Sequence, residues 1–327
     1  MESYFQTMNV KLSRQTLSNW VVNAATELEN VYDCMKKEIL KRDYIHADET
    51  PVKVIDSRGK ESKSKHYMWV YVSKDFDNSI ILYDYQKTRS SSCPVNFLGD
   101  FSGYLQTDGY SGYNKVKNAK RLYCLAHIRR KFYEIIENLK DETLKKSRAI
   151  IGFNYCEQIY KVEKDLREQY SSSDNYYDDR HRIRLEKIAP ILQEFKGYVD
   201  TEIENALPQS ALGKALKYAK NLLPYMNTYL TNGCLEIDNN TAERAVKPFV
   251  IGRKNWLFSN TPKGARSSAI IYSIVETAKA NGLIVEKYLT YLFNEVSKLE
   301  IKDMDILKKF MPWSTELPEN LYSTQQK

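Results

Sequence analysis

The stretch YIHADETPVKVID, Tyr44 to Asp56, predicts a β-strand that carries two adjacent acids in its middle. Alternate side chains of a strand lie on one face, so Asp48 shares its face with Thr50 and Val52. A carboxylate on such a half-buried face must be neutralised or held by an opposite charge. A bound metal ion is one such charge, and a basic side chain is another. The stretch therefore raises the question of what balances Asp48.

The segments that follow predict the rest of a sheet. HYMWVYV (66–72) and SIILYDYQ (79–86) are rich in β-branched and aromatic residues and are separated by turn-forming residues. With the first strand they form, most simply, an antiparallel meander. A short helix, a strand ending at Asp108 and the stretch RLYCLAHIRRKFYEII, which begins as a strand and becomes helical, come next. This order is that of a ribonuclease-H-like α/β fold with a mixed five-stranded sheet and flanking helices.

The chain is expected to contain an N-terminal helical segment, a core in two parts, a helical insertion and a tail. Apolar residues step by three and four from Leu17 to Met35, which predicts one helix of about two dozen residues. Ser13 precedes it as an N-cap, and Gly282 fits the C′ position of a later helix. The expected bounds are 1–43 for a partial helix-turn-helix and linker helix, 44–131 for the first part of the core, 132–230 for the insertion, 231–294 for the second part and 295–327 for the tail.

Two basic blocks account for the positive charge of the chain. The net charge is +7, and the excess falls within 44–131 and 231–294. Lys115 to Lys131 contains seven basic residues and no acid, and Arg244 to Arg266 contains six and no acid. Such blocks favour a polyanion, because each cation that neutralises a phosphate releases a counterion. An ordinary solvated surface is the alternative for either block.

Several function classes are disfavoured by composition. The five cysteines are scattered and include no CxxC pair, so neither a disulfide framework nor a zinc ribbon is indicated. No run of 18 apolar residues occurs, and the N-terminus lacks the apolar core of a signal peptide. We therefore expect a cytoplasmic protein with no membrane partner.

Three acids stand where the predicted fold brings elements together. Asp48 lies within the first strand, Asp108 ends the fourth, and Glu243 lies on a helix after the insertion. Phosphodiester chemistry needs an activated oxygen nucleophile and charge stabilisation, which two Mg²⁺ ions roughly 3.5–4 Å apart supply. Mg²⁺ prefers hard oxygen ligands, so a few carboxylates and substrate phosphates suffice. Mn²⁺ is expected to substitute.

Each acid also has a plain structural interpretation. Asp48 and Glu49 have the alternative interpretation of exposed polar residues before the kink at Pro51. Asp108 and Gly109 form a common turn pair. Asn240 and Glu243 have the spacing of a capping box. What favours the catalytic interpretation is that all three fit one fold order and that two of them border the basic blocks.

Several long motifs in order resemble the IS66 family of insertion-sequence transposases, from about Tyr44 to Phe293. They are HADETP, QTDGYSGYN, CLAHIRRKF, DNNTAERAVKPFVIGRKNWLFS and AIIYSIVETAKANGL. The resemblance implies a ribonuclease-H-like DDE transposase with Asp48, Asp108 and Glu243 as its metal-binding and catalytic triad. It implies DNA cleavage that exposes a 3′-hydroxyl at a transposon end, followed by attack of that hydroxyl on target DNA.

Cys124 and His127 reproduce a C-x-x-H pattern that follows the second acid in several DDE families. If both are helical they share a face, and His127 is a candidate to contact the scissile phosphate or a leaving oxygen. Half a zinc site is a competing interpretation of this pair, but the sequence has no partner cysteine pair, and a core histidine is the favoured alternative for His127. The alternatives are an i,i+4 ion pair with Glu243 for Lys247 and a core position for Trp256. The candidate DNA-binding residues are Arg129, Arg130, Lys131, Arg244, Lys247, Arg253, Lys254 and Trp256.

The expected partners are transposon-end and target DNA, a second copy of the chain on DNA, and accessory proteins of the same element. Members of the family usually carry further N-terminal material, including a whole helix-turn-helix, and this chain opens inside what resembles that motif, at LSRQTLSNW. A truncated, inactive DNA-binding remnant is therefore the alternative function. A glycosidase would also use paired carboxylates, but a neutral glycan gives the two basic blocks no role.

Overall fold

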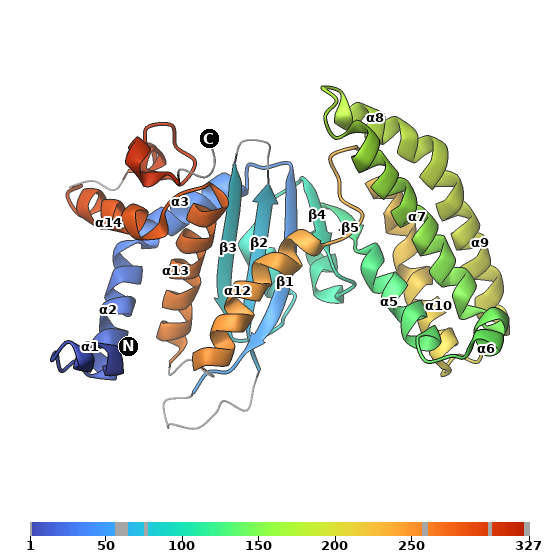
Figure 1. Cartoon of the computed structure of the whole chain (residues 1–327), viewed down its shortest axis with the longest axis horizontal. Coiled ribbons are helices and arrows are strands. Elements are labelled where there is room, and N and C mark those ends of the chain that lie inside the picture. Colours follow the sequence, from blue (N-terminus) through green and yellow to red (C-terminus); the bar gives the residue numbers. More distant parts are fainter. Residues whose placement is uncertain (1, 56–64, 75–77, 257–260, 300–302, 324–327) are drawn as a thin grey trace. The chain divides into compact units, whose positions relative to one another are not determined.

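The computed structural model describes residues 2–55, 65–74, 78–256, 261–299 and 303–323. The chain forms two compact units, whose elements are labelled in Figure 1. Unit 1 contains Met1–Gly103, Gly112–Asn118 and Asn240–Lys327, and unit 2 contains Tyr104–Ser111 and Ala119–Asn239.

The strands of unit 1 form the predicted antiparallel meander. They are β1 (Tyr44–Val52), β2 (His66–Lys74) and β3 (Ser79–Gln86). Asp48 is opposite Val70 in the register of β1 and β2, and Val70 is opposite Tyr83 in that of β2 and β3. Residues opposite each other in an antiparallel pair point to the same side of the sheet. Asp48, Val70 and Tyr83 therefore face the same way.

Two helices cover this face, α12 (Asn240–Trp256) and α13 (Pro262–Ala280) (Figure 1). Both contribute small or aromatic residues to a buried apolar cluster with the strands, which lets the helices approach the sheet closely. Pro248 lies within α12 and cannot donate a hydrogen bond to the preceding turn. The cluster consists of Val52, Val54, Met68, Val70, Val72, Tyr83, Ala245, Phe249, Ala265 and Ala269.

Helix α13 also protects the outer edge of β3. The Thr277 hydroxyl donates to the carbonyl of Ile81 at 2.9 Å and accepts from its N–H at 3.0 Å. The Ser273 hydroxyl accepts from the N–H of Tyr83 at 2.8 Å, and the Asn281 amide bonds both backbone groups of Ser79. These polar residues recur every four positions, with Ser273 and Thr277 in α13 and Asn281 as its C-cap. They replace the neighbouring strand that an exposed edge would otherwise recruit.

The opposite face of the meander packs on α3 (Glu29–Ile39) and α4 (Ser92–Leu98). The rings of Tyr71 and Phe97 stack with centroids 3.7 Å apart. The Tyr32 hydroxyl donates to the carbonyl of Tyr83 at 3.0 Å. The sheet of unit 1 is therefore covered on both sides, and its core is the region around β2.

The N-terminal helix differs from the prediction. Ser13 does cap α2 (Arg14–Glu27), its hydroxyl accepting from the N–H of Thr16 at 3.0 Å. The predicted single helix is wrong, however, because α2 ends at Glu27 and α3 begins at Glu29. Leu28 between them leaves helical geometry with ψ of 5° and is itself buried. A break at an apolar residue keeps the apolar stripe intact, so periodicity alone does not reveal it.

The remaining elements of unit 1 are short or terminal. As predicted, Gly282 follows α13 at the C′ position with a positive φ of 76°. The bounds are Glu2–Thr7 for α1, Val285–Val296 for α14 and Met304–Leu307 for α15.

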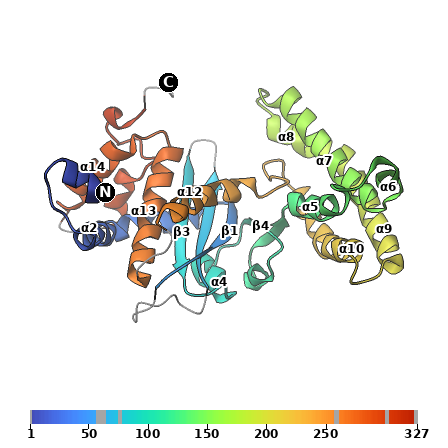
Figure 2. The same cartoon turned by 60° about the horizontal axis from the view of Figure 1, so that its bottom comes forward.

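Unit 2 combines a parallel strand pair with a helical bundle. The strands β4 (Tyr104–Thr107) and β5 (Lys120–Tyr123) pair in parallel. In the bundle, α5 (Leu125–Ile136) and α9 (Ala189–Asn205) each contact α7 (Ala149–Tyr170) and α10 (Ala211–Leu222) (Figure 2). The helical bounds are Leu125–Ile136 for α5, Asp141–Lys146 for α6, Ala149–Tyr170 for α7, Tyr176–Ile183 for α8, Ala189–Asn205 for α9, Ala211–Leu222 for α10 and Met226–Tyr229 for α11, with a π-helical segment at Arg184–Ile188 between α8 and α9.

The strand order β3-β2-β1-β4-β5 makes a mixed five-stranded sheet, which confirms the predicted fold class. Among the described residues, no helix combines the length and apolar character that a membrane span requires.

Candidate active site

Asp48 lies on the face of the meander that α12 covers. Its partner in the register, Val70, belongs to the buried cluster that includes Ala245 and Phe249 of α12. Asp48 itself is only partly buried, whereas Thr50, two residues further along the same face, is 7% exposed. One carboxylate oxygen, Oδ1, accepts from the N–H of Glu49 at 2.8 Å. Asp48 therefore lies on the interior face of its strand, as predicted.

Glu49, the adjacent acid, points to the other face and is already neutralised. Its side chain is 1% exposed and forms an ion pair with Arg89, whose Nε donates to Oε1 at 2.7 Å. The hydroxyl of Tyr113 donates to Oε2 at 2.6 Å. With these two partners, the Glu49 carboxylate has a structural role on the face of the sheet that packs on α4. The alternation of the strand thus separates two neighbouring acids into different environments.

Glu243 lies in the first turn of α12, where the positive end of the helix dipole favours a carboxylate. Helix α12 packs on β1 and β2, and its buried side includes Ala242 and Ala245. Glu243 is partly buried between this side and the exposed residues Arg244 and Lys247. In unit 1, therefore, Asp48 and Glu243 belong to a strand and a helix that pack against each other.

Asp108 directly follows β4 in unit 2. Its Oδ1 accepts from the N–H of Tyr110 at 2.9 Å, which forms the turn that the Asp-Gly pair predicts. Gly109 has no room for a side chain, because a Cβ there would lie 2.7 Å from the hydroxyl of Tyr218. Burial, with the nearby Asp108 carboxylate and Cys124, raises the pKa of Tyr218 to about 12. Tyr218 is therefore a neutral hydrogen-bonding group beside Asp108.

Cys124 and His127 lie at the start of α5. Cys124 is buried and precedes the helix as its N-cap, and His127 is within the first turn and partly buried. The Cys124 carbonyl accepts from the N–H of His127 at 3.3 Å, and its Sγ accepts from the N–H of Asn239 at 3.2 Å. Because Cys124 stands just outside the helix, the two residues are linked through the first helical turn.

The candidate DNA-binding residues differ in their surroundings. Arg129 forms an ion pair with Glu157 of α7 and lies over the ring of Phe153 at 4.7 Å. Lys131 is 3.4 Å from Glu134, one turn further along α5. Arg253, Lys254 and Trp256 belong to α12, but their side chains lie outside the described residues. Three of the candidates have exposed side chains: Arg130, Arg244 and Lys247.

Comparison with known proteins assigns the class of the chain. Residues 1–267 match the family described as "Transposase IS66 family". The chain belongs to the IS66 transposase family. It is 26% identical to uncharacterized protein y4qI of Sinorhizobium fredii (strain NBRC 101917 / NGR234), over 96% of this chain and 58% of the relative. It is likewise 26% identical to uncharacterized protein y4jD of that organism, over 95% of this chain and 61% of the relative. The chain thus spans less than two thirds of the curated relatives it matches.

Membership of the IS66 family makes the chain a DDE transposase by class, as the motifs predicted. Sequence reasoning missed the partners of Glu49, because Arg89 and Tyr113 are distant in sequence. It also missed the buried ion pairs of Glu163 with Arg180 and Arg184 in unit 2, because these residues resemble ordinary surface charges of helices. No pattern of spacing distinguishes these groups before their burial is known.

Proposed function

We propose that this IS66 family protein catalyses metal-dependent cleavage and strand transfer of DNA phosphodiesters, with Asp48, Asp108 and Glu243 as metal ligands. The observation that carries the proposal is the division of the two neighbouring acids of β1. On one face, Glu49 forms an ion pair with Arg89 and accepts a hydrogen bond from Tyr113. Asp48 is partly exposed on the face where α12 brings the helix of Glu243. An acid so placed suits a counter-ion supplied from solution.

The donor set fits Mg²⁺, because all three proposed ligands are carboxylates and Mg²⁺ prefers oxygen. When bound, two such ions would activate the attacking oxygen and stabilise the leaving oxygen of the phosphodiester. Mn²⁺ has similar ligand preferences and is proposed to substitute. Tyr218 beside Asp108 stays protonated, so it adds no further negative charge to this site.

Other residues would bind the substrate and move protons. The exposed cations Arg130, Arg244 and Lys247 would neutralise the DNA backbone and fix its register. His127 would donate a hydrogen bond to the scissile phosphate or a proton to the leaving oxygen. The 3′-hydroxyl released at a transposon end would then attack a phosphodiester of the target.

We propose that the protein acts on DNA in the bacterial cytoplasm. Two transposon ends must be joined to one target, so we propose a homodimer assembled on DNA. Accessory proteins of the same element are proposed as further partners.

The experiment compares Asp108→Ala with Asp100→Ala in a nicking assay on DNA that carries transposon ends, with Mg²⁺ or Mn²⁺. Asp100 is an exposed acid nearby in sequence and serves as the matched control. We expect nicking to disappear in Asp108→Ala and to persist in Asp100→Ala. Binding of Mn²⁺, followed by its paramagnetic resonance signal, should weaken in Asp108→Ala alone. Equal and negligible nicking by the wild type and both variants would favour the inactive DNA-binding remnant instead.

A further inference from the structure

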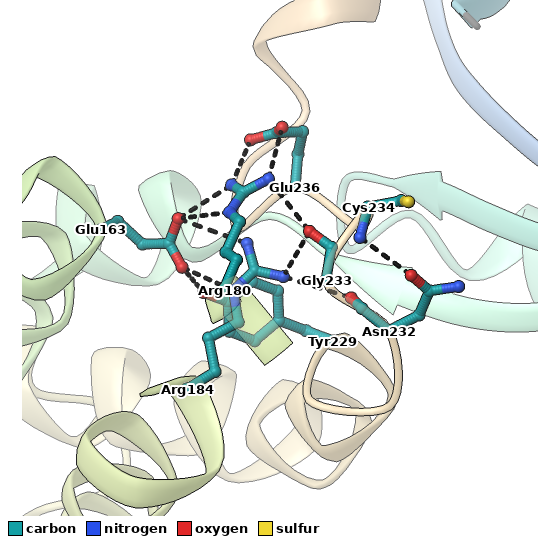
Figure 3. Close-up of polar contacts among 8 residues, drawn as sticks. All are labelled: Glu163, Arg180, Arg184, Tyr229, Asn232, Gly233, Cys234 and Glu236. Atoms are coloured by element: carbon teal, nitrogen blue, oxygen red, sulfur yellow. Dashed lines mark hydrogen bonds and ion pairs between the residues drawn. The ribbon is translucent and has the colours of Figure 1, made fainter. Parts of the chain in front are cut away.

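A cluster of buried charges lies in unit 2, outside the proposed active site (Figure 3). The carboxylate of Glu163, in α7, lies between the guanidinium groups of Arg180 and Arg184. Arg180 Nη2 is 2.8 Å from Oε2, and Arg184 Nε is 2.7 Å from Oε1. The three side chains are 1%, 2% and 0% exposed, in the same order. The hydroxyl of Tyr229 donates to the same carboxylate.

The helix geometry explains how two arginines reach one acid. Arg180 is in α8 and Arg184 begins the π-helical segment, so the two side chains lie one turn apart on the same side. A π-helical turn is wider than an α-helical one and recurs at functional positions. Buried charges are costly unless each is fully paired, so removal of one of these groups would leave a buried charge uncompensated.

The two arginines also hold a segment that has no helix or strand, residues 232–239, called the strap here (Figure 3). Arg180 binds the carboxylate of Glu236 with two parallel hydrogen bonds, of 3.1 and 3.0 Å. The carbonyl of Gly233 accepts from Arg180 at 3.2 Å and from Arg184 at 3.3 Å. The carbonyl of Asn232 accepts from Arg184 at 3.2 Å. Paired hydrogen bonds of an arginine to a carboxylate fix both position and orientation.

Gly233 fits closely at this point of the strap. A Cβ at this position would lie 1.9 Å from the carbonyl oxygen of Tyr177, which no side chain tolerates. The backbone of the strap therefore lies directly against α8.

The far end of the strap is attached to the start of α5. The carbonyl of Ile237 accepts from the N–H of Leu125 at 3.0 Å. The N–H of Asn239 donates to Sγ of Cys124 at 3.2 Å. The next residue, Asn240, begins α12, and Glu243 is in the first turn of that helix. All these bonds of the strap are to unit 2, and its covalent continuation is the helix of Glu243.

We propose that Arg180 and Glu236 are positioning residues, which hold the strap to the insertion and thereby restrict where the first turn of α12 begins. The buried cluster of Glu163, Arg180 and Arg184 anchors Arg180 in unit 2, and Glu236 connects Arg180 to the strap. The tethering of the strap follows from the bonds just described, and its effect on Glu243 rests on the proposed function. The insertion thus contributes to the active site without supplying a ligand.

The experiment uses Glu236→Ala and Glu236→Gln in the full chain. Glu236 has a side chain that is 39% exposed, so its loss leaves the pairs of Glu163 intact and the fold in place. The matched control is Glu186→Gln, which removes a surface acid 3.9 Å from Arg182 on the same run of helix. Cys234 lies in the strap and is exposed, whereas the other four cysteines are buried, so a nitroxide label can be attached to it selectively. Burial raises the pKa of its thiol, so labelling is done at mildly alkaline pH.

We expect the label to be more mobile in Glu236→Ala than in the wild type or Glu186→Gln, by paramagnetic resonance. Nicking turnover should fall about tenfold or more with the KM for DNA unchanged, because a small misplacement of a ligand is costly. Glu236→Gln, which keeps one acceptor, should restore part of both. Unchanged label mobility overturns the tether, and increased mobility with unchanged turnover overturns the positioning role. A wild type no more active than Asp108→Ala overturns the proposed function, and label mobility alone then decides the tether.

Discussion

Replacing Glu163 by glutamine should destabilise unit 2 strongly. The substitution preserves the shape of the side chain and one acceptor oxygen, but it removes the negative charge that lies between two guanidinium groups, which are 2% and 0% exposed. Arg184 then loses its buried counter-charge, and Arg180 keeps only the partly exposed Glu236. A buried cation without a partner costs far more than the pair contributed.

The magnitude follows from the charge environment of Glu163. Burial alone would raise its pKa, but the attraction and hydrogen bonds of Arg184 and Arg180 outweigh burial and hold the pKa at about 2, against an ordinary 4.5. This difference is equivalent to about 3 kcal/mol of charge stabilisation at neutral pH. Breaking a buried pair from one side typically costs about 3 to 5 kcal/mol. We therefore expect Glu163→Gln to lower the free energy of unfolding by about 3 to 5 kcal/mol.

Urea unfolding at pH 7, followed by circular dichroism of the helices, measures this change. The matched control is Glu186→Gln, whose ion pair with Arg182 has both side chains more than 60% exposed. The control should change the unfolding free energy by less than about 0.5 kcal/mol. A loss below about 1 kcal/mol in Glu163→Gln would refute the view that this cluster organises unit 2.

Three further predictions concern the acids and the cations. Because Glu163 has a depressed pKa in the folded state, the difference in unfolding free energy between wild type and Glu163→Gln should be constant above about pH 4.5 and shrink as the pH falls toward 2. Asp48→Asn should abolish nicking and leave the free energy of unfolding in urea nearly unchanged. Glu49→Gln should retain nicking but lower the free energy of unfolding by about 1 to 3 kcal/mol, because it leaves buried partners unsatisfied. The opposite pattern would exchange the roles of the two acids. Affinity for duplex DNA should fall steeply from 50 to 200 mM salt, with Arg130→Ala reducing the slope of log affinity against log salt by about one; a flat response would remove the polyanion from the proposal.

The sheet was predictable because its information is local. Alternation and β-branched content identify each strand of the meander. Asp48 is two residues before Thr50, so both side chains lie on the same face of the strand. The break at Leu28 was not predictable, because Leu28 continues the apolar stripe and is buried as the stripe requires. Protection of the β3 edge by Thr277 and Ser273 was equally hidden, since polar residues inside a helix usually indicate a solvent-exposed side.

The candidate site was predictable only in part. The sequence indicates which acids a DDE transposase would use, and it places Asp48 on the inner face of its strand. It does not show that Glu49 is balanced by Arg89, forty positions away in the chain, because that pairing depends on the path of the loop after β3. The distinction between a ligand and a structural acid thus depends on tertiary contacts, even for adjacent residues.

The same limitation applies to the insertion, where Glu163 is followed at once by Lys164. Lys164 pairs with Glu168 on the surface, 3.6 Å away, whereas Glu163 is almost completely buried. Gly233, which admits no side chain, lies close to α8, and its carbonyl accepts from the two arginines that pair with Glu163. We therefore expect stability to depend on Glu163 and positioning to depend on Glu236. Glu163→Gln should weaken the fold, but Glu236→Ala should free the strap in a folded protein, so comparison of the two variants separates these roles.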